Sequence, residues 1–190
     1  MKIIRGAIRL GLLCALGAAM LGGIAPPVAR ADEAPEYQVK AAFLYNFAKF
    51  VDWPSAAFSG ENSPLIIGVL GDDPFGDALD KTVEGKTVND RKIVVRRYKQ
   101  ADDAKSCHIL YVSRSEKKQV DKDLDRLDKT NTLTVGDMDQ FLQRGGMVNF
   151  IIEDKKVRLE INPDAAERAN LKVSSKLLQV AHIVKPPRRN

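Results

Sequence analysis

The chain has 190 residues, which is enough for one domain or at most a small pair. Its 44% hydrophobic and 29% charged residues are typical of a folded globular protein and exclude a disordered, collagenous or coiled-coil chain. The formal charge of +5 would favour nucleic-acid binding, but the distribution of the basic residues argues against it.

The N-terminal segment has the organisation of a secretory signal. A basic stretch (1–9) precedes an uncharged apolar run (10–25), and small residues at Ala29 and Ala31 form a cleavage site. The apolar run is shorter than the roughly 20 residues that span a bilayer, although an uncleaved membrane anchor stays an alternative. We therefore predict that 1–31 is a signal peptide and that the mature protein is periplasmic.

Cleavage changes both the charge and the cysteine count of the remaining chain, 32–190. This part carries 26 basic and 25 acidic residues, so its charge of +1 gives no strong electrostatic source for nucleic-acid binding. Cys14 leaves with the signal and only Cys107 remains, which excludes an intramolecular disulfide. Cys107 is expected to be buried, because a free cysteine behaves as a small hydrophobic residue. We predict one α/β domain over 32–190, with a short basic tail.

The first predicted element of the mature chain is a helix over 36–53, which Pro54 ends. Its apolar arc covers about 200°, roughly twice the stripe that packing on one sheet requires. Lys40 is the only charged residue within the arc. Two interpretations stay open: the helix is sandwiched deep in the core, or part of the arc contacts another subunit or protein.

Strands and helices alternate after this helix. The continuous apolar run 65–70 predicts a strand that is buried on both faces. Further strands are predicted at 92–98, 108–112 and 132–135, with helices near 77–83, 117–127 and 138–143. A hairpin then joins 147–152 to 157–161 through a charged four-residue turn, and helices begin after Asn162 and Ser174. This order predicts helices covering a mainly parallel sheet of about six strands, with an antiparallel edge hairpin.

The loop after strand 65–70 occupies the usual ligand position in open α/β sheets. Its glycines match neither the dinucleotide-binding nor the phosphate-loop spacing, and Asp72 and Asp73 would repel phosphate. An ordinary turn is the favoured interpretation, and a small-molecule site at Asp72 and Asp73 stays open.

Cys107 and His108 are the only adjacent pair that resembles a nucleophile and a base. Neighbours on a strand point to opposite faces, so a thiol dyad would need the other mature histidine, His182. Two histidines and one cysteine also leave few ligands for zinc. We predict no catalytic residue, no metal and no cofactor; a hydrolase or thiol enzyme using Cys107 or His182 is the least favoured alternative.

Three parts of the chain resemble the YfiR family of small exported proteins. They are Tyr37 to Pro54, Thr134 to Asp137 with Gly145 to Phe150, and Leu159 to Ala166 with Leu171 to Leu178. The resemblance implies a Rossmann-like three-layer domain, often dimeric, that binds and inhibits the periplasmic sensor part of an inner-membrane diguanylate cyclase or a similar receptor. This would lower cyclic di-GMP and biofilm formation, and an outer-membrane lipoprotein would sequester the inhibitor. Disulfides present in better-known members are missing here, which excludes intramolecular redox control.

The helix 36–53 supplies the candidate partner-binding residues. The bulky Phe43, Phe47 and Phe50 are expected to face the sheet. The interface candidates lie at the margins of the apolar arc: Tyr37, Val39, Ala41 and Ala48. The alternative function is a periplasmic small-solute binding module that reports to a membrane sensor.

Overall fold

A computed structural model describes residues 33–186, so the predicted signal peptide and the last four residues lie outside the described part. An eight-stranded sheet has the order β10-β8-β7-β6-β5-β2-β4-β3. Its strands are β2 (Leu65–Leu70), β3 (Thr87–Val88), β4 (Arg91–Tyr98), β5 (Ile109–Val112), β6 (Leu133–Gly136), β7 (Val148–Glu153), β8 (Lys156–Ile161) and β10 (His182–Ile183). A separate antiparallel pair joins β1 (Val51–Asp52) to β9 (Lys172–Val173).

The sheet confirms the predicted fold class. Strands β4, β2, β5, β6 and β7 run parallel to one another, β7 and β8 form the antiparallel hairpin, and β3 pairs antiparallel to β4. The sheet has more strands than predicted because β3 and β10 contain two residues each, too few to leave a periodic pattern. The apolar strand β2 is buried along its whole length, as its composition predicts.

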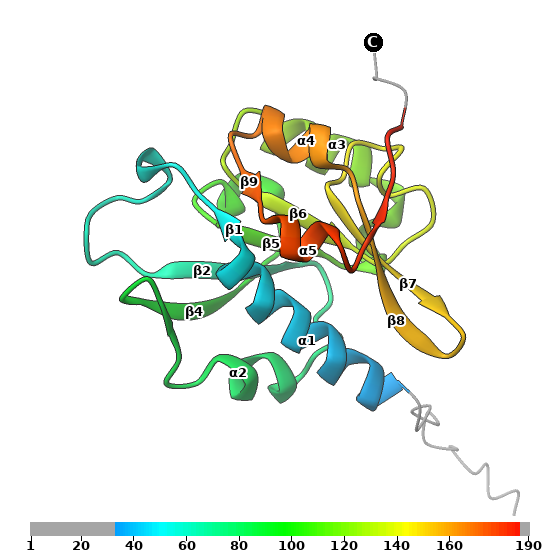
Figure 1. Ribbon diagram of the computed structural model, residues 1–190, viewed down its shortest axis with the longest axis horizontal. Helices are drawn as coiled ribbons and strands as arrows, with labels where there is room; N and C mark the ends of the chain where they lie inside the picture. Colours follow the sequence, from blue (N-terminus) through cyan, green and yellow to red (C-terminus); the bar gives the residue numbers. More distant parts are fainter. Residues whose placement is uncertain (1–32, 187–190) are drawn as a thin grey trace, which may run out of the picture.

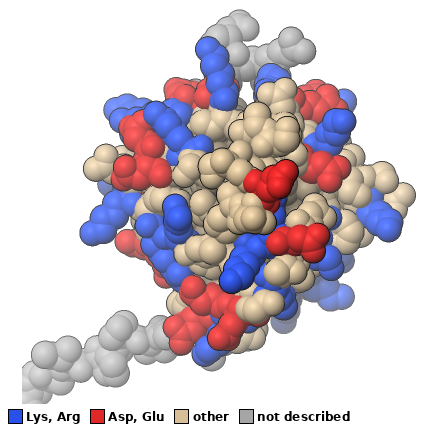
Figure 2. Space-filling view, turned by 90° about the vertical axis from the view of Figure 1, so that its left-hand side faces the viewer, with Lys and Arg blue, Asp and Glu red and all other residues tan. Residues whose placement is uncertain are grey.

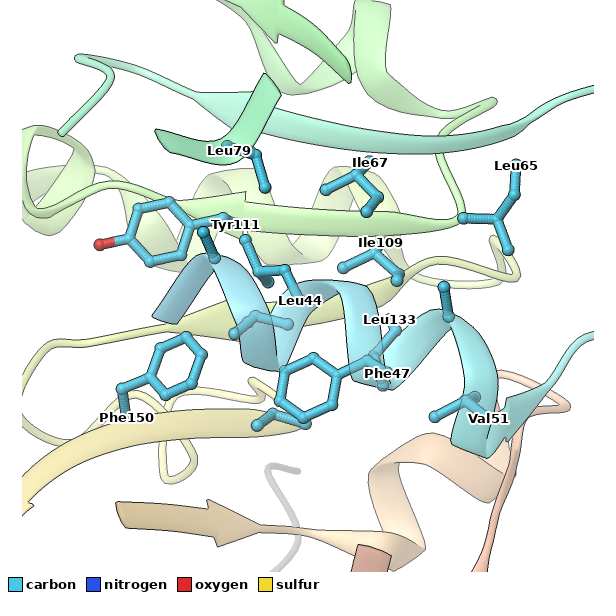
Figure 3. Close-up of a cluster of buried hydrophobic side chains, with 14 of the residues drawn as sticks. Leu44, Phe47, Val51, Leu65, Ile67, Leu79, Ile109, Tyr111, Leu133 and Phe150 are labelled. Atoms are coloured by element: carbon cyan, nitrogen blue, oxygen red, sulfur yellow. The ribbon is translucent and has the colours of Figure 1, made fainter. Parts of the chain in front are cut away.

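Helices cover both faces of the sheet and complete three layers (Figure 1). They are α1 (Glu33–Phe50), α2 (Asp77–Val83), α3 (Val120–Leu127), α4 (Pro163–Arg168) and α5 (Ser175–Leu178), with 3-10 turns η1 (Ser55–Ala57), η2 (Ala101–Ala104) and η3 (Arg114–Lys118). One hydrophobic core joins α1, α2, α4 and α5 to one sheet face, and a second joins η2 and α3 to the other. Figure 3 shows the first core, where Leu44 and Phe47 of α1 lie over strand residues such as Ile109.

The helix predicted over 36–53 is α1, which begins and ends three residues earlier. Val51 and Asp52 leave the helix because they pair with β9, and Ser174 N–H donates to the carbonyl of Phe50 at 2.8 Å. Tertiary pairing therefore overrides the helical pattern before Pro54 is reached.

The helix predicted over 138–143 is wrong, because this segment forms only turns. The Phe141 ring lies against Gly136 and Gly146, where a Cβ atom at either glycine would overlap it. Asn149 Oδ1 accepts a hydrogen bond from Met138 N–H at 3.2 Å. The chain therefore wraps around a buried aromatic ring, an arrangement set by close contacts with two glycines and Asn149 rather than by helical periodicity. The predicted four-residue hairpin turn is also shorter, since Glu153 pairs with Lys156 around two residues.

Candidate functional site

The wide apolar arc of α1 is almost entirely core. Ala41, Leu44 and Phe47 have no exposed surface and Ala48 has 2%. The arc is wide because α1 packs on β5 and β8 and also against α2, so the sheet covers one part of the arc and a neighbouring helix of the same layer covers another. The predicted role of Ala41 and Ala48 as interface residues is therefore wrong, since neither side chain reaches the surface. Of the other two candidates, Tyr37 is half-buried and Val39 is 44% exposed.

Lys40, the one charged residue of the arc, is also buried and is paired. Its side chain is 1% exposed, and its Nζ lies 2.6 Å from Oδ2 of Asp137, whose side chain is fully buried. Glu36, one turn earlier on α1, supplies a second carboxylate to Lys40. Tyr37 Oη donates to the same Asp137 oxygen at 3.1 Å. Because Asp137 directly follows β6, this cluster fixes the first half of α1 to the carboxyl edge of the sheet.

Strand β5 contributes two more members of this cluster. Arg114 follows β5, and its Nε donates to the carbonyl oxygen of Asp137 at 3.0 Å while lying 3.2 Å from Oδ1. Tyr111 of β5 is fully buried beside it. Burial, reinforced by the Asp137 charge, raises the pKa of Tyr37 to about 12 and raises that of Tyr111 further. Both hydroxyls therefore stay protonated at neutral pH.

We call Glu36, Tyr37, Lys40, Tyr111, Arg114 and Asp137 the buried polar cluster after its buried centre, Lys40 and Asp137; the Arg114 side chain is exposed at the rim. Its two cations and two anions balance, and Asp137 is engaged by several donors at once. Such a cluster is suited to holding elements in register rather than to acid–base chemistry. The sequence contained one signal for it: a lone lysine in an apolar arc requires a buried counter-ion. Asp137, directly after an apolar strand, was an available partner that sequence reasoning did not select.

The predicted ligand loop lies at the point where the strand order reverses, between β2 and β5. Asp73 is committed to internal contacts, because Oδ1 accepts from Phe75 N–H at 2.7 Å and Oδ2 lies 2.9 Å from Arg97 Nε. Asp72 is exposed, and its backbone N–H donates to Ser115 Oγ at 3.0 Å. A small-molecule site at Asp72 and Asp73 stays a prediction, with only the Asp72 carboxylate exposed to meet a ligand.

Four large apolar side chains are exposed on α1, β7 and β10 and in the turn after α5. They are Val39 (44%), Ile152 (51%), Val180 (63%) and Ile183 (46%), and we call them the apolar surface. Strand pairing places Ile152 opposite Val157, and Ile183 beside Ile161. Since alternate residues share a face, Ile152 and Ile183 lie on the face that α1 covers. Sequence reasoning missed both, because β7 resembles an ordinary core strand and the two-residue β10 leaves no strand pattern.

The structure does not bring the thiol and the second histidine together. Cys107 is buried as predicted, at 3% exposure, and burial raises the pKa of its thiol to about 12. His182 is exposed on β10, with Nε2 3.7 Å from Glu153. Because the thiolate is the nucleophile, a buried thiol of high pKa weighs against a thiol enzyme.

His108 is a structural residue at the opposite edge of the sheet from the buried polar cluster. Its Nδ1 accepts a hydrogen bond from Ile66 N–H at 3.1 Å, and its ring stacks on Phe58 with centroids 4.4 Å apart. Burial lowers its pKa to about 4, from an ordinary value of 6.5. His108 therefore stays neutral in the folded protein under mildly acidic conditions.

This depressed pKa predicts a loss of stability on acidification. Between pH 6.5 and about 4 the unfolded chain binds a proton at His108 that the folded chain excludes, so the free energy of unfolding falls as pH falls. We expect His108→Asn to flatten this slope in urea titrations over that range, and His182→Asn, on an exposed position, to leave it unchanged. Equal slopes for all three proteins would contradict the assignment.

Charge is mixed over the surface. On the face seen in Figure 2, basic and acidic side chains are interspersed around uncharged areas, without a continuous field of one sign. This agrees with the near balance of charges in 32–190 and gives no electrostatic support for nucleic-acid binding.

Comparison with known proteins places the chain in a family. No helix within residues 33–186 is long and apolar enough to cross a membrane. No curated protein sequence matches the chain. The solved structure of a conserved domain protein from Vibrio cholerae O1 biovar El Tor str. N16961 shares 14% identity with it at a TM-score of 0.49. The match covers 63% of this chain and 54%, about half, of the Vibrio chain. Residues 37–182 match the model of one family, and the chain therefore belongs to the YfiR/HmsC-like family.

Proposed function

We propose that the protein is a periplasmic regulator that binds the sensor part of an inner-membrane diguanylate cyclase and inhibits it, lowering cyclic di-GMP and biofilm formation. Membership of the YfiR/HmsC-like family supports a regulatory rather than catalytic role in cyclic di-GMP signalling. The signal-like organisation of 1–31 supports the periplasmic location. An outer-membrane lipoprotein that competes for the same surface, and a homodimer, belong to the same proposal.

The observation that carries the proposal is the apolar surface. Val39, Ile152 and Ile183 are each about half exposed, although nearly every other large apolar side chain among residues 33–186 is covered. These three side chains belong to α1, β7 and β10, which all contact β8, and exposed apolar side chains on neighbouring elements are typical of a site of protein interaction. Inhibition then requires that this surface bind the inactive state of the cyclase more tightly than the active state.

The buried polar cluster gives this surface a fixed shape. Val39 lies next to Lys40 on α1, and the Lys40 ammonium is anchored to Asp137 and lies 5.8 Å from the Phe150 ring centroid on β7. The distance between Val39 and the β7–β8 hairpin is therefore held by a buried contact. A preorganised surface loses less conformational entropy on binding, which supports a direct role in recognition.

Affinity capture tests the proposal. Mature protein, tagged at its C-terminus, is cross-linked to solubilised membranes, and captured proteins are identified by mass spectrometry. We expect a membrane diguanylate cyclase, with recovery about tenfold lower for Val39→Glu and Ile152→Glu, because a charge in an apolar interface is costly to desolvate.

Gln100→Glu is the matched control, since Gln100 is exposed beside η2, which belongs to the opposite layer. Near-UV circular dichroism checks that each variant is folded. Capture of a membrane protein without a cyclase domain, or equal recovery of all four proteins, would contradict the proposal.

A further inference from the structure

Strand β4 has an open outer edge. β3 pairs only with Arg91 and Lys92, and Ile93 N–H reaches the carbonyl of Lys86 at 3.4 Å. Within residues 33–186, no strand pairs with the rest of β4 on that side. An uncovered edge of this length is a template for another strand.

The backbone hydrogen bonds of β4 show which of its residues face the open edge. The Tyr98 carbonyl accepts from Gly71 N–H at 3.0 Å on the β2 side, whereas Ile93 N–H points to the β3 side. Alternate residues direct their backbone groups to opposite sides of a strand. Val95 and Arg97 therefore direct N–H and C=O groups to the open edge.

The two faces beside this edge differ in chemistry. On the α2 side lies an open groove of about 510 Å³ that is lined by the apolar Val83, Ile93 and Val95 and, along α2 and its end, by the charged Asp77, Asp80, Lys81 and Glu84. The acidic side chains there favour apolar over acidic partner residues on this face. Arg97 also lies on this side, but Asp73 and Asp80 neutralise it. On the other side, Lys92 and Arg96 are exposed. The edge thus offers an apolar contact on one face and positive charge on the other.

We propose that this edge binds an extended acidic segment of a partner protein as an added strand. Its apolar side chains would enter the groove beside α2, and its alternating carboxylates would face Lys92 and Arg96. Main-chain hydrogen bonds from Val95 and Arg97 would supply affinity, and the two faces would supply specificity. This interface is separate from the apolar surface and does not depend on the proposed function.

The positive charge of β4 also argues against a second copy of this chain as the partner that pairs with this edge. The segment 91–99 contains five basic residues and no acidic residue. Pairing it with itself would place cations opposite or diagonal to cations, which destabilises a strand pair. An acidic segment instead meets opposite charge at these positions.

Fluorescence anisotropy with a labelled synthetic peptide of alternating Glu and Val, about eight residues long, tests the proposal. We expect saturable binding that weakens with added salt. Arg96→Glu should weaken it by about tenfold. Lys122→Glu on α3 makes the same charge change at an exposed site and should have no effect. A peptide of alternating Lys and Val should not bind.

Backbone pairing is tested separately by Val95→Pro. Proline removes an outward N–H that the β2 ladder does not use, a change that edge strands tolerate, and it should abolish peptide binding. Unchanged peptide binding by Arg96→Glu, or by a folded Val95→Pro variant, would overturn the proposal. Sedimentation would also overturn it if the protein self-associates and Arg96→Glu strengthens that self-association. The Val39→Glu variant should bind the peptide normally, which separates this result from the proposed function.

Discussion

Replacing Asp137 by Ala is expected to lower the free energy of unfolding by about 3–5 kcal/mol, because the buried Lys40 ammonium loses its principal counter-ion. Glu36 alone remains for Lys40, and it is partly exposed. Tyr37 also loses a hydrogen-bond acceptor, and Arg114 loses an ion-pair partner while keeping its hydrogen bond to the backbone carbonyl. Urea unfolding of the purified mature protein measures the loss.

A surface ion pair provides the control for this experiment. Asp139 lies 3.3 Å from Lys117, and both side chains are well exposed. Asp139→Ala should therefore cost no more than about 1 kcal/mol. The double variant Lys40→Met with Asp137→Leu should be less damaging than Asp137→Ala alone, since it removes both buried charges. A loss for Asp137→Ala no larger than the control would show that the pair does not anchor α1.

Replacing Phe47 by Ala is expected to cost about 3–5 kcal/mol, as for other fully buried aromatic side chains. The Phe47 ring stacks on Phe43 and on Phe150, at centroid distances of 6.3 and 6.0 Å, so its loss would leave a cavity between α1 and β7. Ala48→Glu should be at least as damaging, because it forces a carboxylate into the same core.

Lys49 tests whether these effects depend on burial. It neighbours Ala48 but is exposed, so Lys49→Ala should change the free energy of unfolding by less than about 0.5 kcal/mol. Thermal and urea unfolding of the three variants are compared with the parent protein. If Ala48→Glu were as stable as Lys49→Ala, the first core would not extend under α1 as the structure describes.

The elements that could be predicted from the sequence are those whose hydrophobic pattern extends over several consecutive residues. The apolar run at β2 and the alternation in β8 are strong patterns, and both elements are present. The two-residue strands β9 and β10 have no such pattern, because pairing with distant strands creates them. The turn around Phe141 likewise depends on glycines that approach it in space.

The candidate site was predicted only in outline, for a similar reason. The width of the α1 arc was visible, but periodicity alone does not distinguish a helix covered by a sheet and a neighbouring helix from one that contacts a partner. The structure assigns most of the width to the core, which leaves Val39 at the surface. Ile152 and Ile183 join it through strand pairing, and neither has a feature that marks it as exposed.

The most direct test of the account is cyclic di-GMP synthesis by the captured cyclase, reconstituted so that its periplasmic part faces purified mature protein. The account predicts that synthesis falls as the protein is added, and that Val39→Glu and Ile152→Glu need about tenfold more protein for the same inhibition. Two results would contradict the proposal that the apolar surface is the inhibitory site. In the first, synthesis stays constant while the protein is bound; in the second, both variants inhibit synthesis as well as the parent protein does.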